Sequence, residues 1–321
     1  MWTGFSSNGL TSLKYPVKRL VSELRLKRII RRLASTPRNS LENPVEHAAA
    51  VEWIAREFEQ IDLEVTRQVF EIPGQHPLRK GMNIVAGLRT SSPSHERPII
   101  VGAHYDTVPN SPGADDNASG VAALLECARV LTKSKRTEQV IFVAFDAEEI
   151  QPNVDGLHGS TEFVSRLSKS YPPTAAIVFE SVGFSSKTIK QRLPGSFRFL
   201  FPSTYRTLKR HSFSANSLLI LSRGKGQVIS DHLEQIATQP DIMLPVLPLK
   251  VPPWMPLVRN LRRSDHTPFW MAGIPAVMIT DTANFRNPHY HQMSDTADTI
   301  DLQLVAKAAR MVVEVVKRDV I

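Results

Sequence analysis

Short apolar runs alternate along this chain with longer segments in which apolar residues recur at helical spacing. The run Val-Ile-Phe-Val-Ala-Phe at 140–145 is the most apolar, and it suits a strand that is buried on both faces of a sheet. Strands are predicted at 65–72, 83–88, 98–103, 139–145, 175–179 and 275–280. Helices are predicted at 118–131, 158–168, 228–238 and 302–317, and a further helix begins after Asn43-Pro44. This alternation predicts an α/β fold with a mixed, largely parallel central sheet and helices on both faces.

Two segments depart from this pattern. Residues 1–45 are polar and basic, and we interpret them as an N-terminal extension that precedes a single folded domain at 46–321. Residues 239–256 contain six prolines, which remove backbone donors, so we expect no regular interior structure there. This segment is either a surface connection or a semi-rigid loop that forms part of a pocket wall.

Charge and composition narrow the set of partners. The 321 residues carry a formal net charge of +8, and the segment 14–32 alone holds eight Lys and Arg residues against Glu23. We interpret this segment as a solvated helix face, with contact to a membrane surface as the alternative. It lacks the aromatic residues and zinc-finger spacing of a nucleic-acid reader, so no nucleic-acid partner is expected. Nothing in the sequence predicts an oligomeric state.

Cellular location is predicted from what the sequence lacks. The lone Cys127 excludes an internal disulfide. Neither a signal-peptide core nor a run of about 18 apolar residues is visible. We therefore expect a cytoplasmic protein.

Histidines and acids follow the predicted strands. His104 and Asp106 come directly after the strand at 98–103, and ligands bind at the carboxyl ends of strands in an open α/β sheet. Being two residues apart, they share a face of an extended chain, so the carboxylate could orient a metal-binding imidazole. A structural histidine is the alternative. Asp115 and Asp116 lie in a glycine-bounded loop that leads into a helix, where capping requires only one acid.

Paired glutamates end the most apolar strand. Glu148 and Glu149 repel each other, and partial burial disfavours the charge of both, so cations would relieve the cost. One glutamate could bind metal while its neighbour acts as general base. Glu180 ends another strand, and His289 and His291 follow the strand at 275–280. Together these strand ends supply enough ligands for two cations that share a carboxylate.

The ordered motifs resemble the co-catalytic two-zinc exopeptidases, which include bacterial leucyl aminopeptidases and glutamate carboxypeptidase. The motifs are 102–120, 146–149 with 156–160, Glu180, Ser264-Asp265-His266 and 287–291, and the resemblance covers about residues 45–318. It implies that 46–321 is a zinc peptidase catalytic domain with two Zn ions per chain. It further implies that Asp116 bridges the ions, that His104 and Glu180 complete one site, and that Glu149 and His291 complete the other. Glu148 resembles the general base, and Asp106 resembles the acid that orients His104.

The resemblance implies an aminopeptidase that hydrolyses the N-terminal bond of a peptide or aminoacyl amide through a two-zinc-activated water. The alternatives are a carboxypeptidase or N-acyl amino-acid amidohydrolase on the same fold, a glutaminyl-cyclase-like protein, and a non-catalytic relative such as the transferrin receptor. Arg262 and Arg263 could pair with a substrate carboxylate, or could form a solvated basic turn. The hypothesis requires the five predicted ligands to converge in space.

Overall fold

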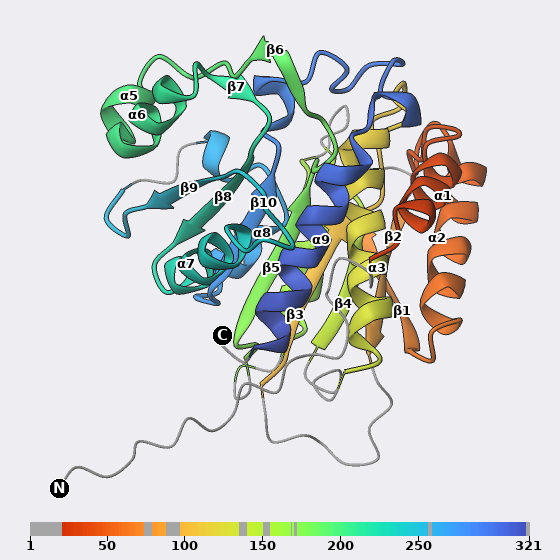
Figure 1. Ribbon diagram of the computed structural model, residues 1–321. Coiled ribbons are helices and arrows are strands. Elements are labelled where there is room, and N and C mark those ends of the chain that lie inside the picture. The colour runs from red at the N-terminus through yellow and green to blue at the C-terminus, as the bar shows by residue number, and fades with distance from the viewer. Residues whose placement is uncertain are drawn as a thin grey trace, which may run out of the picture.

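Eight strands form one sheet at the centre of the molecule (Figure 1). The computed structural model describes residues 21–73, 79–87, 97–134, 140–149, 155–167, 169, 172–255 and 259–318. The strand order is β1-β2-β4-β3-β5-β10-β8-β9. The strands are β1 (Glu64–Ile72), β2 (Arg79–Gly87), β3 (Ile99–His104), β4 (Val140–Phe145), β5 (Ala175–Glu180), β8 (Leu218–Arg223), β9 (Val246–Val251) and β10 (Ala276–Thr280). A separate pair joins β6 (Ser186–Lys190) to β7 (Ser214–Ala215).

The centre of the sheet is parallel and its flanks are mixed. Strands β4, β3, β5 and β10 run parallel to one another, β1, β2 and β8 join antiparallel, and β9 is parallel to β8. This confirms the predicted mixed, largely parallel sheet. Alternate residues of β4 explain its apolar run, because Phe142 and Ala144 belong to the main core, whereas Val143 and Phe145 pack on the opposite face.

Helices cover both faces of the sheet, as predicted. The main core lies under α1 (Glu23–Leu33), α2 (Pro44–Glu59), α3 (Gly120–Leu131), α7 (Gly226–Ala237) and α9 (Leu302–Lys317). The other face carries α4 (His158–Ser165), α8 (His266–Met271), α5 (Phe197–Leu200) and α6 (Pro202–Arg210). Figure 1 shows that α5 and α6 lie together at one corner, beyond β8 and β9.

The amino-terminal helix packs into the main core. Leu26, Ile29, Ile30 and Leu33 of α1 are buried there, so only the other side of the basic segment is solvated. Residues 14–20 of that segment lie outside the described residues. The predicted boundary at residue 45 stays a prediction, since the described extension shares the core of the predicted domain.

The proline-rich segment contains a strand that the sequence did not predict. Strand β9 lies within 239–256 and includes Pro248. It is the outermost strand of the sheet, where a residue without an N–H is tolerated. The prediction was that this segment forms no regular interior structure; β9 is regular, but it lies at the edge of the sheet. The predicted element ends at 88, 139 and 168 lie outside the described residues.

Within the described part of the chain, no helix combines the length and apolarity that crossing a membrane requires. Cytoplasmic location and the lack of a nucleic-acid partner stay predictions.

Candidate metal centre

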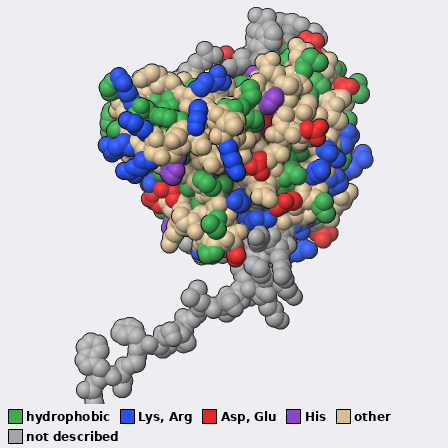
Figure 2. All heavy atoms as spheres, turned by 45° about the horizontal axis from the view of Figure 1, so that its top comes forward, with side chains coloured by type: hydrophobic (Ala, Val, Ile, Leu, Met, Phe, Trp, Pro, Cys, Tyr) green, Lys and Arg blue, Asp and Glu red, His purple; other side chains and the backbone are tan. Residues whose placement is uncertain are grey.

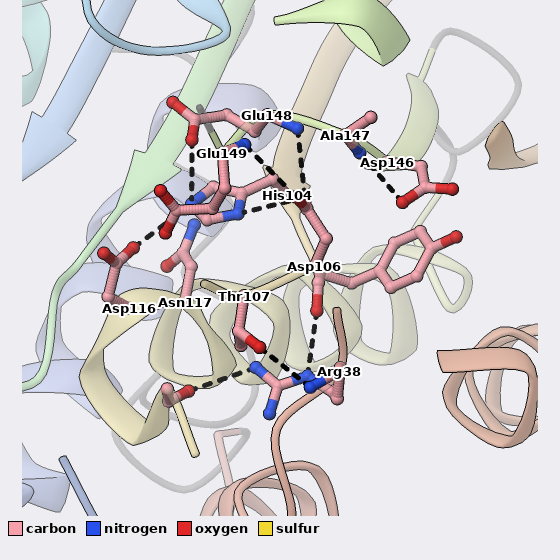
Figure 3. Close-up of polar contacts among 12 residues, drawn as sticks. Arg38, His104, Asp106, Thr107, Asp116, Asn117, Asp146, Ala147, Glu148 and Glu149 are labelled. Atoms are coloured by element: carbon pink, nitrogen blue, oxygen red, sulfur yellow. Dashed lines mark hydrogen bonds and ion pairs between the residues drawn. The ribbon is translucent and has the colours of Figure 1, made fainter. Parts of the chain in front are cut away.

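The predicted ligands come from adjacent strands and meet at the carboxyl edge of the sheet, and Figure 3 shows His104, Asp116 and Glu149 among them. His104 ends β3 and Glu180 ends β5, while Glu148 and Glu149 follow β4. His291 lies in the loop after β10, and Asp116 lies in a wide turn, Ala114–Ser119, that leads into α3. Because β4, β3, β5 and β10 are neighbours, side chains far apart in the sequence form one cluster.

Asp116 lies between two imidazoles. His104 Nε2 is 3.3 Å from Asp116 Oδ1 and 3.4 Å from Glu180 Oε2. His291 Nε2 is 3.1 Å from Asp116 Oδ2 and 3.2 Å from Glu149 Oε1. Each carboxylate oxygen of Asp116 therefore faces a different histidine, and each histidine faces a different glutamate.

Several of these atoms are buried without a hydrogen-bond partner. They are His104 Nε2, Asp116 Oδ1, Glu149 Oε1 and His291 Nε2. Buried polar atoms are normally paired, so unpaired nitrogen and oxygen atoms that face one another point to a ligand between them. Among the described residues, two groups could each hold a metal ion: His104, Glu148 and Glu180, and Asp116, Glu149 and His291. Imidazole and carboxylate together suit a divalent transition metal.

Charge supports the same conclusion. Burial alone lowers the pKa of His104, but the carboxylates of Glu148 and Glu180 raise it well above its usual value. Burial also opposes the charge on His291, yet contacts with Asp116 and Glu149 raise its pKa to about 10. The cluster thus holds more negative charge than neutral histidines can balance, and bound cations would supply the missing positive charge.

Glu148 and Glu149 differ in their surroundings. Burial is the main cause that raises the pKa of Glu148 well above its usual range, and the nearby charges of Glu180 and Glu149 add to it. Burial and the Asp116 charge raise the pKa of Glu149 to about 7, against the opposing effect of His291. Glu148 Oε2 lies 4.0 Å from His104 Nε2, so its carboxyl group borders the cluster without pairing directly with a histidine.

Asp106 supports both the histidine and the glutamates. Its Oδ1 lies 3.5 Å from His104 Nδ1 and accepts the backbone N–H of Glu148 at 3.1 Å. Its Oδ2 accepts the backbone N–H of Glu149, also at 3.1 Å. One buried carboxylate thus lies beside the imidazole and fixes the start of the glutamate-bearing turn by two hydrogen bonds.

The structure separates the alternatives that the sequence left open. Asp115 turns away from the cluster and accepts a hydrogen bond from Asn287 Nδ2 at 2.7 Å, whereas Asp116 faces both histidines. His289 Nδ1 contacts a serine hydroxyl outside the cluster, whereas His291 reaches Asp116.

Sequence reasoning missed two residues that hold this site. Arg38 is buried and donates to the carbonyls of Tyr105, Pro112 and Gly113, in the loop between His104 and the wide turn (Figure 3). Asp295 accepts the backbone N–H groups of 115 and 116, at 2.9 and 3.1 Å. A lone arginine in a segment interpreted as an extension, and a lone aspartate after the last motif, gave no signal.

A cavity of about 390 Å³ adjoins the cluster. Glu148, Glu149, Glu180 and His291 line its inner end. Apolar side chains form most of the remaining wall, including Phe197, Phe201, Leu219, Leu221, Leu249 and Met278. Leu249 belongs to β9, so the proline-rich segment does contribute to a pocket wall.

Two groups of candidate metal ligands beside a cavity, at the carboxyl edge of an α/β sheet, are the arrangement expected of a metal-dependent hydrolase. Residues 83–242 and 255–316 match peptidase family M28, and the chain belongs to that family. Membership confirms the predicted resemblance to the metallo-exopeptidases.

Relatives and solved structures agree with this assignment. The chain is 32% identical over 307 residues to the uncharacterized protein YfbL of Escherichia coli, covering 90% of this chain and 86% of that protein. It is 28% identical to aminopeptidase YwaD of Bacillus subtilis over 74% of this chain, and spans only 45% of that relative.

Among solved structures, BSAP, a zinc aminopeptidase from Bacillus subtilis, superposes with a TM-score of 0.69 at 18% identity, covering 93% of this chain and 95% of its own. A glutaminyl cyclase from Bacteroides thetaiotaomicron gives 0.66 at 18% identity, with 93% and 98% covered. At this identity the likeness shows the fold alone, and it confirms the predicted zinc-exopeptidase-like architecture.

Proposed function

We propose that this chain is a two-zinc aminopeptidase that hydrolyses the N-terminal bond of a peptide or aminoacyl amide. The observation that carries the proposal is the position of Asp116, whose two carboxylate oxygens each face a different histidine. A carboxylate in this position suits a bridge between two ions. The names of the relatives support both the metal and the activity, since one is an aminopeptidase and one solved neighbour is a zinc aminopeptidase.

The proposed metal sites share Asp116. His104 and Glu180 would complete one, and Glu149 and His291 would complete the other. When bound, the zinc pair would lower the pKa of an attacking water towards about 7 and polarise the scissile carbonyl.

Glu148 is the proposed proton carrier. Its buried carboxyl group has a pKa well above the usual range, which suits a base that accepts a proton from water near neutral pH. The same carboxyl group then returns the proton to the leaving amine nitrogen. Asp106 holds Glu148 in place through its backbone N–H. The neighbouring cavity fits a large apolar group of the substrate.

Replacing Glu148 with Gln tests this role. The side chain keeps its shape but cannot accept the proton, so kcat on leucine p-nitroanilide should fall by about 10²–10⁴-fold, the usual contribution of a general base. Zinc content, measured by atomic emission, should stay at two equivalents. Glu64→Gln is the matched control, because Glu64 is exposed on β1, and it should behave like the wild type.

Two outcomes would contradict the proposal. Unchanged activity of Glu148→Gln would remove the assigned role of Glu148. A wild-type protein that binds a single equivalent of zinc and cyclises an N-terminal glutamine, but does not hydrolyse the anilide, would favour the glutaminyl-cyclase-like alternative.

A further inference from the structure

Arg263 lines the cavity and has only neutral hydrogen-bond partners among the described residues. Its guanidinium donates to Asn284 Oδ1 at 3.2 Å and to the hydroxyl of Tyr290 at 2.9 Å. A guanidinium has five N–H donors in a planar fork, so capacity remains for a bidentate partner. Its neighbour Arg262 is also exposed but does not line the cavity. The structure therefore separates two arginines that the sequence could not distinguish.

Arg263 is linked to both sides of the metal cluster. The ring of Tyr290 stacks on His291 with centroids 3.8 Å apart, so one aromatic side chain separates the guanidinium from that proposed ligand. On the other side, Ser264 follows Arg263 in the chain and donates to Glu180 Oε2 at 2.8 Å. The guanidinium therefore lies one aromatic ring away from His291, in the same cavity as the proposed metal ligands.

The charge pattern of the cavity limits where an anionic group can bind. Three carboxylates, Glu148, Glu149 and Glu180, line the inner end, and the cations proposed there would engage the water and the scissile carbonyl, so no side chain at this end is assigned to a substrate carboxylate. The outer part contains Arg263 and Arg192, the latter donating to a backbone carbonyl.

The surface around the cavity wall formed by α5 is also basic. Figure 2 shows Lys and Arg side chains gathered over the corner formed by α5 and α6, and the exposed ones on these helices are Arg198, Arg206, Lys209 and Arg210. A positive rim raises the local concentration of anionic ligands. The surface charge thus agrees with the placement of Arg263.

We propose that Arg263 binds the free carboxylate of the residue released by hydrolysis. The preferred substrates are then dipeptides and similar amides of α-amino acids, in which a free carboxylate follows one residue after the scissile bond. This inference rests on the proposed hydrolytic function, and it names the substrate class of that site.

The experiment compares leucyl-leucine with leucyl-leucinamide, which differ only in the terminal carboxylate. For the zinc-loaded wild type, kcat/KM should favour the acid by about 10- to 100-fold, the range expected for a charge-assisted bidentate contact. Arg263→Gln should bring this ratio close to one, mainly by raising KM for the acid, and Arg263→Lys should restore part of it. Arg262→Gln is the matched control and should keep the wild-type ratio.

The outcomes distinguish the inference from the function on which it rests. Equal hydrolysis of acid and amide by the wild type overturns the carboxylate contact and leaves the aminopeptidase proposal standing. A parallel loss of both substrates in Arg263→Gln also overturns it, because it shows a general role in positioning Tyr290. Failure of the zinc-loaded wild type to cleave either compound, or the anilide, overturns both proposals.

Discussion

Replacing Arg38 with Met removes a buried guanidinium from the backbone that leads to the metal centre. The guanidinium donates to four carbonyl oxygens, those of Leu33, Tyr105, Pro112 and Gly113, at 2.6, 2.8, 2.6 and 3.1 Å. Methionine fills a similar length but donates nothing, so all four oxygens lose a partner inside the fold.

The expected loss of stability follows from these contacts. Each carbonyl left unpaired costs about 1–3 kcal/mol. Part of this is offset, because burial lowers the pKa of Arg38 to about 10 despite the nearby carboxylates, and methionine avoids that desolvation cost. A net loss of about 3–5 kcal/mol is therefore expected. For a chain of 321 residues this corresponds to a fall in Tm of about 4–7 °C.

Urea unfolding of the zinc-free wild type and variant measures this loss without a contribution from metal binding. Arg31→Met is the control, because Arg31 lies on the exposed side of α1 and its partner Asp298 is exposed and 3.9 Å away. The control should unfold at the wild-type urea concentration. If Arg38→Met lost less than about 1 kcal/mol, the four contacts would not support the loop as we argue.

Asp106→Asn should lower kcat/KM about 10- to 100-fold, because the carboxylate that fixes His104 and the turn at Glu148 is lost; unchanged kinetics with full zinc content would contradict this. His47 supplies a pH test. Burial lowers the pKa of His47, whereas the charge and the hydrogen bond of the Asp146 carboxylate, 2.8 Å away, raise it. The net result is a folded pKa above the unfolded value of about 6.5. The contact contributes its full stability below the unfolded pKa, and this contribution is lost as pH rises through the folded pKa. The free energy of unfolding of the wild type, measured with urea, should therefore exceed that of His47→Gln by less at alkaline than at acidic pH. A difference that grows with pH would contradict this.

The sequence predicted the centre of the sheet and the residues at its edge because both leave a local signal. Strands buried on two faces read as continuous apolar runs, as in β4, and ionisable residues directly after such runs stand out. The five predicted ligands do converge in the structure. Their roles as ligands stay predictions until metal is measured.

What the sequence did not predict depends on distant contacts. Strand β8 is rich in leucine, which is common in helices, and β9 contains a proline that is tolerated only because the strand lies at the edge. Arg38 has no pattern around it, and its importance comes from carbonyls about 70 residues away in the chain. Tertiary structure alone reveals such partners.

The position of Pro248 affects how this protein can associate. Its ring offers no N–H along the free side of β9, and its carbonyl already accepts a hydrogen bond from Thr204 at 2.8 Å. At the opposite border, β1 presents charged residues such as Glu64 and Arg67. Both borders therefore resist the addition of a further strand, so contacts between copies through a continuous intermolecular sheet are disfavoured.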